Sequence, residues 1–326
     1  MSGLKRFLAR WPNRLSLAIV AGFIFVALAA PLLAPKEGKT PVEGFKVLSN
    51  VKGYLPLPPN PQAAFGSMPM GTFNRHLDVL HSLVWGARSA LQFGLTVALL
   101  TTAIGVILGA FSAYLGGLVN SLVMRITDAF LAFPVVVGVV FIQQLHLLAI
   151  EASGGSLLFG DVLEPVSQPI ALLELIEKVD PLLLAMILFS WMAAARLTNT
   201  EVRRILQTDY ILAAQATGVR PVRLVFRHLI PNAIAPAIIL LTRDIGGMVL
   251  LQAALTFIGI GGGSLWGELL VVSRRWIIGP NGNFLTYWWT YLPVTLTIIL
   301  FGVGWSLLGD GLNDWLNPRS KQRNIG

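Results

Sequence analysis

Long apolar stretches alternate with polar segments rich in proline and glycine along the whole chain. Each apolar stretch is uncharged or nearly so over about twenty residues, the length that crosses a lipid bilayer as a helix. The pattern predicts an all-α integral membrane protein with six transmembrane helices, at about 15–34, 89–115, 129–150, 182–200, 232–258 and 291–308.

Two features inside these stretches predict local geometry. Gly105 and Gly109, four residues apart in the second helix, form a small face on which another helix can pack closely. Pro134, near the start of the third helix, lacks the N–H that a helix interior uses. We therefore expect a kink at Pro134.

The distribution of charge predicts the topology. Most of the 24 Lys and Arg residues fall in segments that lie inside if both termini are cytoplasmic, as the positive-inside rule requires. The chain then divides into a cytoplasmic segment with the first helix (1–34), an extracytoplasmic loop (35–88), a core of five helices that includes an inner loop at 201–231 (89–312), and a cytoplasmic tail (313–326).

The outer segments carry weaker helix signals. Four apolar residues at helical spacing predict a helix on the membrane surface at the end of the first outer loop: Leu77, Leu80, Val84 and Ala87. The second outer segment, 151–181, is acidic and predicts a short amphipathic helix after Pro169, with its charges on a solvated face. The third, 259–287, is rich in Gly and Trp.

The first apolar stretch has an alternative interpretation. Ala27-Leu28-Ala29 is typical of the cleavage site of a signal peptide. Pro31 and the apolar continuation Leu32-Leu33 favour a first helix that stays in the membrane.

Composition excludes several functional classes. The chain of 326 residues is 55% hydrophobic and 12% charged, with a mean hydropathy of +0.70, whereas a soluble domain is about 25% charged. The net charge of +8 does not indicate a nucleic-acid partner, because the basic residues gather in inner loops without a nucleic-acid-binding motif. There is no Cys and the four His are scattered, so we expect no metal site.

The sequence also gives no sign of catalysis. Gly38-Lys39-Thr40 imitates the end of a phosphate-binding loop, but Leu33 stands where that motif needs its first Gly. With no Walker A motif, the chain is not expected to hydrolyse ATP or to be an enzyme.

One inner loop, Asp209–Pro231, has the pattern of two short helices joined by a turn. Asp209 can cap the first helix, which Ala213, Ala214 and Ala216 continue. Gly218 can adopt the left-handed conformation that ends a helix.

The second helix of this loop is bounded by two prolines. Pro221 can begin it and Pro231 end it. Its apolar face would be Leu224, Val225 and Leu229, and its basic face Arg220, Arg223 and Arg227. The alternative interpretation is an ordinary basic loop that follows the positive-inside rule.

This loop resembles the EAA loop of ABC-importer permeases, in which Glu-Ala-Ala precedes a Gly and, about a dozen residues later, Leu-Pro or Ile-Pro. Ala213, Ala214, Gly218, Ile230 and Pro231 fall in register, whereas Leu212 stands where the family usually has Glu. Three further segments are similar to the dipeptide/oligopeptide branch of that family: Phe226-Arg227-His228, Ala132-Phe133-Pro134 and the tail that begins Gly309-Asp310-Gly311-Leu312.

The resemblance implies a permease subunit of an ATP-driven importer in the inner (plasma) membrane of a prokaryote. It implies a heterodimer with a second permease, two ATP-binding subunits that hold ATP and Mg, and an extracytoplasmic solute-binding protein, with no cofactor in this chain. The residues expected to couple to the ATPase are Asp209, Tyr210, Ala213, Ala214, Ala216, Gly218, Arg220 and Arg223.

Several alternatives stay open at this point. Peptides, nickel chelates and oligosaccharides are all cargo of such importers. A secondary transporter or channel would work without ATPase subunits, but inverted repeats are not evident. A membrane-anchored enzyme or scaffold would need a long polar segment for its soluble site.

Arg243 and Asp244 lie within the fifth predicted helix. A charge at that depth costs at least ~2.5 kcal/mol on insertion scales, so it should face protein or water. Neighbouring residues of a helix do not face each other, so the two are not a self-contained pair. Two hypotheses remain: an ion pair that packs helices or subunits together, or a translocation path in which Arg243 meets an anionic group of the substrate.

Overall fold

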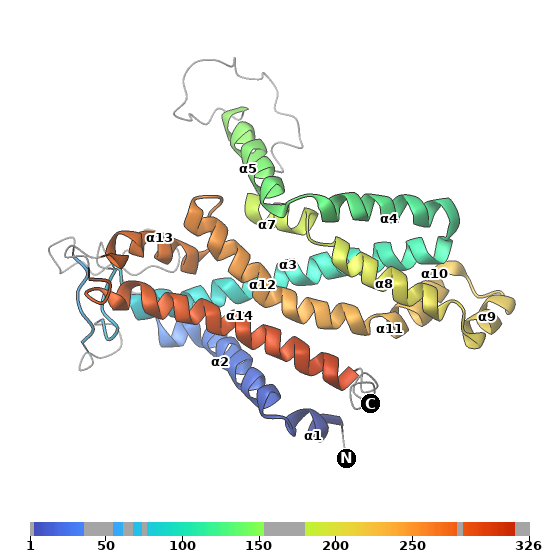
Figure 1. Cartoon of the computed structure of the whole chain (residues 1–326), viewed down its shortest axis with the longest axis horizontal. Coiled ribbons are helices and arrows are strands. Elements are labelled where there is room, and N and C mark those ends of the chain that lie inside the picture. Colours follow the sequence, from blue (N-terminus) through green and yellow to red (C-terminus); the bar gives the residue numbers. More distant parts are fainter. Residues whose placement is uncertain are drawn as a thin grey trace. The chain divides into compact units, whose positions relative to one another are not determined.

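The computed structural model is helical and describes residues 3–35, 55–60, 68–73, 77–152, 180–278 and 283–316 (Figure 1). Its helices are α1 (Gly3–Leu8), α2 (Trp11–Leu33), α3 (Val79–Leu115), α4 (Gly117–Ala132), α5 (Val135–Ala152), α7 (Pro181–Leu188), α8 (Met192–Ile205), α9 (Asp209–Ala216), α10 (Pro221–Leu224), the π-helical turn η2 (Val225–Leu229), α11 (Ile230–Ala233), α12 (Ala235–Ile258), α13 (Leu265–Ile277) and α14 (Trp288–Leu316). Within the described ranges, β-structure amounts to isolated bridge residues, and Thr72 pairs with Asp78. The predicted all-α class is confirmed.

Five helical stretches of the described chain are long and apolar enough to cross a membrane: Trp11–Leu33, Val79–Leu115, Pro181–Ile205, Ala235–Ile258 and Trp288–Leu316. The third predicted span, 129–150, falls on a bent pair of helices, α4 with α5, whose axes differ by 89°. The described chain therefore has five spans, or six when this pair counts as one.

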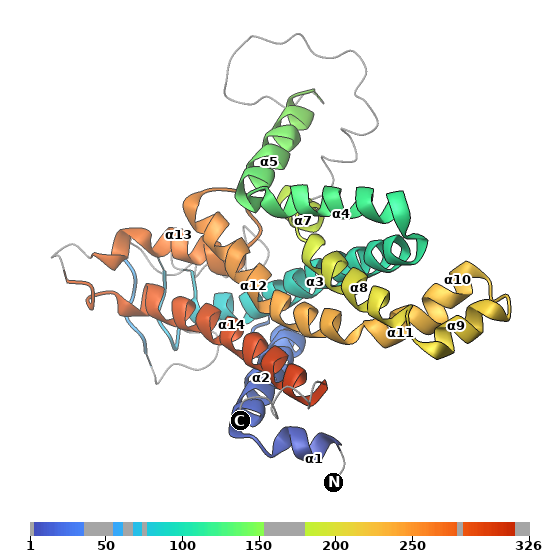
Figure 2. The ribbon, with the colours of Figure 1, turned by 45° about the vertical axis from the view of Figure 1, so that its right-hand side comes forward.

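The bend between α4 and α5 lies where Pro134 predicted a kink, and it is sharp in both views (Figure 1, Figure 2). Phe133 has extended backbone angles, with φ −83° and ψ 128°, because a residue before proline is disfavoured in the helical region. Proline thus ends α4 instead of bending one continuous helix.

The predicted surface helix at the end of the first outer loop is not separate. α3 begins at Val79 and runs unbroken for 37 residues, so the boundary predicted at 88/89 lies inside it. Leu77, Val84 and Ala87 are buried in protein. Their apolar stripe packs against other parts of this chain. The same stripe would occur in a helix lying on the membrane surface, so the sequence pattern does not distinguish the two.

The C-terminal third departs from expectation in two places. α14 extends to Leu316, so the first residues of the predicted tail, 313–316, are helical. The Gly/Trp-rich segment contains an unpredicted helix, α13, whose first turn is capped by Ser264, which accepts a hydrogen bond from Gly267 N at 3.1 Å. The helix predicted after Pro169 lies outside the described residues.

The chain forms two compact units, Met1–Thr96 with Thr242–Gly326 (unit 1) and Val97–Leu241 (unit 2). In unit 1, α14 packs along α2 and against α13 (Figure 2). Trp266 of α13 lies edge-on to Phe23 of α2 and Phe301 of α14, with ring centroids 6.1 and 5.7 Å apart. Edge-to-face contact is a favoured aromatic geometry, so these rings fix three helices around one point.

In unit 2, α3 packs closely on α8 through the small face predicted at Gly105 and Gly109. A Cβ on Gly105 would lie 2.5 Å from the Trp191 carbonyl oxygen and 2.6 Å from Ala194 Cβ. A Cβ on Gly109 would overlap the Ala195 carbonyl oxygen. Only glycine permits this backbone approach.

Polar contacts tie α4 to the same pair of helices. Asn199 of α8 donates from Nδ2 to Asn120 Oδ1 of α4 at 2.6 Å and to Ser112 Oγ of α3 at 2.9 Å. Arg196 of α8 pairs with Asp128 of α4 at 3.0 Å. α3, α4 and α8 therefore form one platform in unit 2.

Gly109→Ala should destabilise the purified protein in detergent, by about 1–3 kcal/mol, because the added methyl overpacks the α3–α8 contact. Gly22→Ala is the matched control, since a Cβ on Gly22 of α2 has no neighbour within 4 Å. Thermal unfolding followed by fluorescence-detected gel filtration measures both variants. Equal midpoints for the two would contradict the close α3–α8 contact.

Candidate functional site

The loop predicted between Asp209 and Pro231 contains two helices joined by a turn, as expected, but its cap differs. The N-cap of α9 is Thr208, with extended backbone angles, and Asp209 is the first helical residue. Asp209 therefore does not cap α9. Its carboxylate lies in the first turn, where a negative charge stabilises the helix by interacting with the positive end of the helix dipole.

The turn after α9 is built around Gly218. Gly218 has φ +77°, its N–H donates to Gln215 O at 3.0 Å, and the N–H of Val219 donates to Ala214 O at 3.3 Å. A Cβ at Gly218 would meet nothing within 4 Å. Glycine is thus favoured by the left-handed backbone rather than by crowding within this chain.

Pro221 occupies the first turn of α10, as predicted, but Pro231 does not end the second helix. The Ile230 N–H donates to the Val225 carbonyl five residues earlier, which makes a π turn between α10 and α11. In a regular α-helix the Pro231 ring would clash with the carbonyl four residues back, and the π turn shifts that register. After a break at Ile234 the chain enters α12.

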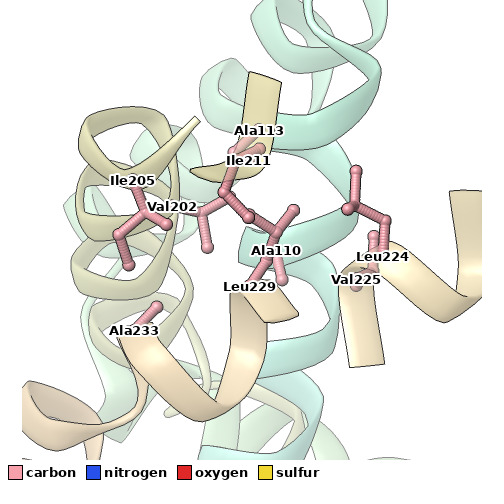
Figure 3. Close-up of a cluster of buried hydrophobic side chains, with 9 residues drawn as sticks. All are labelled: Ala110, Ala113, Val202, Ile205, Ile211, Leu224, Val225, Leu229 and Ala233. Atoms are coloured by element: carbon pink, nitrogen blue, oxygen red, sulfur yellow. The ribbon is translucent and has the colours of Figure 1, made fainter. Parts of the chain in front are cut away.

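The inner side of the α9–α11 segment is anchored in unit 2. Figure 3 shows Ile211, Leu224, Val225 and Leu229 with Ala110 and Ala113 of α3 and with Val202 and Ile205 of α8. Ile211, Leu224, Val225 and Leu229 are fully buried, and burying one such side chain is worth roughly 1.5–3 kcal/mol. The apolar half of the prediction is confirmed.

The outer side of the same segment is open. Most of the residues expected to couple to an ATPase are exposed: Asp209, Tyr210, Ala213, Ala216, Gly218, Arg220 and Arg223. Ala214 is the exception, because it packs against the buried cluster, so its small size is explained within this chain.

Two apolar residues on this outer side escaped the sequence analysis. Leu212 and Val222 are 50% and 59% exposed. In sequence, Leu212 stands out only as a departure from the usual Glu. Val222 is a single apolar residue between Arg220 and Arg223, so no apolar pattern marks it. Tyr210, Leu212 and Val222 thus add exposed apolar side chains to this segment, on which Arg220 and Arg223 are also exposed. Such a surface can bury apolar area against another protein.

The charges predicted in the membrane lie in unit 1. Arg243 Nη2 of α12 is 2.8 Å from Asp310 Oδ1 of α14. Asp244 is half-buried, and Ile245 beside it lies in the core. Arg243 and Asp244 are therefore not a mutual pair, as expected from helix geometry.

Asp310 was missed as the partner of Arg243 because the sixth helix was expected to end near Leu308. The only sequence signal is Asp310 itself, an acidic residue directly after the predicted sixth span. A second pair on α14 joins Arg10 and Asp314. Within the described ranges no group of His, Cys, Asp and Glu could hold a metal ion.

Comparison with known proteins gives relatives along almost the whole chain. The Dipeptide transport system permease protein DppC of Alkalihalophilus pseudofirmus is 29% identical over 308 residues, 94% of this chain and 85% of the relative. The Di/tripeptide transport system permease protein DppC of Pseudomonas aeruginosa is 30% identical over 305 residues, 91% and 85% of the two chains. The Dipeptide transport system permease protein DppC of Haemophilus influenzae is 28% identical over 312 residues, 92% and 90%.

The family described as "Binding-protein-dependent transport system inner membrane component" matches residues 105–322. This range covers α4 to α14, and so contains both the α9–α11 segment and the Arg243–Asp310 pair. The chain therefore belongs to the family of inner membrane components of binding-protein-dependent transport systems, as a multi-pass membrane protein.

Proposed function

We propose that this chain is a permease subunit of an ATP-driven importer of dipeptides or oligopeptides. The observation that carries the proposal is the two-sided α9–α11 segment. Its inner side is buried on α3 and α8, and its open side carries exposed apolar residues beside basic ones. The names of the relatives, which are dipeptide or di/tripeptide permeases, support peptides as the cargo.

In this proposal the α9–α11 segment is the coupling element. Tyr210, Leu212 and Val222 enter a groove on an ATP-binding subunit, and Arg220 and Arg223 contact its rim. Because the inner side is anchored by fully buried side chains, a push on the outer side moves α3 and α8 with it. A rigid lever of this kind fits switching between two packed arrangements.

The proposed topology has six spans with both termini in the cytoplasm. The exposed Arg220, Arg223 and Arg227 support a cytoplasmic α9–α11 segment, because short inner loops carry the excess of basic residues. The bent α4–α5 pair then serves as the third span, and α13 lies on the extracytoplasmic side of the membrane.

The proposed complex contains this chain, a second permease, two ATP-binding subunits and a solute-binding protein. ATP and Mg bind to the ATP-binding subunits, and this chain supplies membrane passage without catalysis. Arg243 and Asp244 belong to the translocation path in this proposal. The half-exposed side chain of Arg243, 52% accessible in this chain, supports that assignment.

Purification from native membranes in mild detergent tests the function. We expect a second permease and ATP-binding subunits to co-purify with this chain, and the complex to take up a dipeptide in proteoliposomes only with ATP and a binding protein. Uptake by this chain alone, driven by an ion gradient, would instead identify a secondary transporter.

Gly218→Leu should leave the protein inserted and the complex assembled but uncouple ATP hydrolysis from uptake. Forcing a residue with a Cβ into the left-handed conformation costs roughly 1–2 kcal/mol, which the turn can avoid by rearranging α9. Gly218→Asn is the matched control, because Asn tolerates this conformation better, and it should retain more uptake per ATP. Unchanged coupling in Gly218→Leu would argue against α9 as the coupling element.

Single cysteines test the topology, because the chain has none of its own. Gln207 and Thr286 are both exposed, in proposed inner and outer segments. A membrane-impermeant thiol reagent should label Thr286→Cys in intact cells and Gln207→Cys only after permeabilisation. The reverse pattern would invert the topology.

A further inference from the structure

An exposed face of α12 and α14 in unit 1 carries the Arg243–Asp310 pair. Along α12 the exposed residues recur every three or four positions, which places them on one side of the helix: Arg243, Gly247, Leu250, Ala254 and Ile258. α14 has a matching series: Leu296, Ile299, Val303, Ser306 and Asp310. Arg243 and Asp310 are the charged members of these two series.

Close helix packing sets the geometry of this pair. A Cβ on Gly246 would lie 3.1 Å from the Gly302 carbonyl oxygen and from Trp305 Cβ, so α12 and α14 meet at glycines. Leu250 packs over Gly302. Arg243 lies one turn before this contact on α12, and Asp310 lies two turns after it on α14. Arg243 Nη2 and Asp310 Oδ1 are 2.8 Å apart.

The position of Arg243 along α12 disfavours lipid as the surroundings of the pair. Arg243 lies eight residues after Ala235, about 12 Å along α12 at 1.5 Å per residue. Charged groups at such depth face protein or a water-filled path. Both side chains are about half exposed, 52% for Arg243 and 55% for Asp310, so this chain alone does not cover them.

We propose that the Arg243–Asp310 pair is a charge-exchange site for zwitterionic peptides, in which Arg243 binds the peptide carboxylate and Asp310 binds the peptide ammonium. The inference rests on the proposed peptide cargo and goes further by giving each end of the peptide a partner. A free peptide carries one charge of each sign, and so does the pair. Guanidinium and carboxylate are a favoured combination because two parallel hydrogen bonds can form.

Pairing explains how such a site can pass a substrate on. A lone Arg at this depth would hold a carboxylate strongly and would itself be costly when empty. In the pair, each ion satisfies the other between transport events, and a peptide must break one ion pair to form two. Binding is then strong enough for entry and weak enough for release, as conduction requires.

Reciprocal charge selectivity tests the proposal. The full complex in proteoliposomes, with ATP and binding protein, takes up Ala-Ala, Ala-Glu or Ala-Lys, and each rate is divided by the rate of the unmodified complex. This ratio cancels the preference of the binding protein. Arg243→Gln leaves a lone carboxylate and should slow Ala-Glu more than Ala-Lys. Asp310→Asn leaves a lone guanidinium and should do the opposite, each by about fivefold, the size of one half-exposed ion pair.

A matched control lies one turn further along α14. Arg10→Gln and Asp314→Asn remove the same charges from the Arg10–Asp314 pair, and both should slow the three peptides equally or not at all. Reciprocal selectivity in the control variants as well would overturn the proposal, because it would mark a general effect of surface charge.

A double variant separates binding from packing. Arg243→Gln with Asp310→Asn leaves no unpaired charge at depth, so a purely structural pair predicts recovery of uptake relative to the single variants. The proposal predicts continued slow uptake of all three peptides by an assembled complex. Recovery in the double variant, or equal losses for all peptides in both single variants, would overturn the inference while unmodified uptake still supports the proposed function. Absence of peptide uptake by the unmodified complex would overturn both.

Discussion

Close contact between helix backbones is the constraint on which the other features of this protein depend. In a bilayer, helices gain little by hiding apolar surface from lipid, so they associate through tight packing and polar contacts. Gly105 and Gly109 in unit 2 leave no room for a side chain, and a Cβ on Gly246 in unit 1 would lie 3.1 Å from its neighbours on α14. Each of these contacts supports a site: the first two hold the platform of the α9–α11 segment, and the third brings Arg243 to Asp310.

Charges in and beside the described helices are likewise paired with neighbouring elements. Arg243 with Asp310, Arg10 with Asp314 and Arg196 with Asp128 each join two different elements within one unit. Exposed pairs of this kind contribute about 1 kcal/mol or less to stability in water. Their value here is geometric, because each pair holds two neighbouring elements together without leaving either charge unpaired.

The α9–α11 segment shows how a loop of a membrane protein becomes a rigid element. Its inner side is buried as thoroughly as a soluble core, and a π turn carries the chain past Pro231 with little interruption. As a result, the exposed Tyr210, Leu212 and Val222 stand on a fixed support. An exposed apolar surface on a rigid support is suited to transmit force, whereas a flexible loop would absorb it.

The sequence by itself determined the membrane class, the approximate spans, the helix–turn–helix pattern of the inner loop and the small face at Gly105 and Gly109. These are local properties. The length of an apolar stretch and the backbone preferences of proline and glycine have the same effect whatever the chain packs against. Even so, the sequence misjudged the start of α3, the end of α14 and the effect of Pro231. Helix ends depend on the contacts that the terminal turns find.

Only the tertiary structure decided which residues meet. Arg243 and Asp310 lie 67 positions apart in the sequence, and neither segment contains a pattern that predicts their contact. The contact depends on where α12 crosses α14, at Gly246 and Gly302. The exposure of Leu212 and Val222, beside the buried Ile211 and Leu224, likewise depends on which side of each helix rests on α3 and α8. Periodicity shows that a helix has two faces, but the packing of its neighbours decides which face is buried.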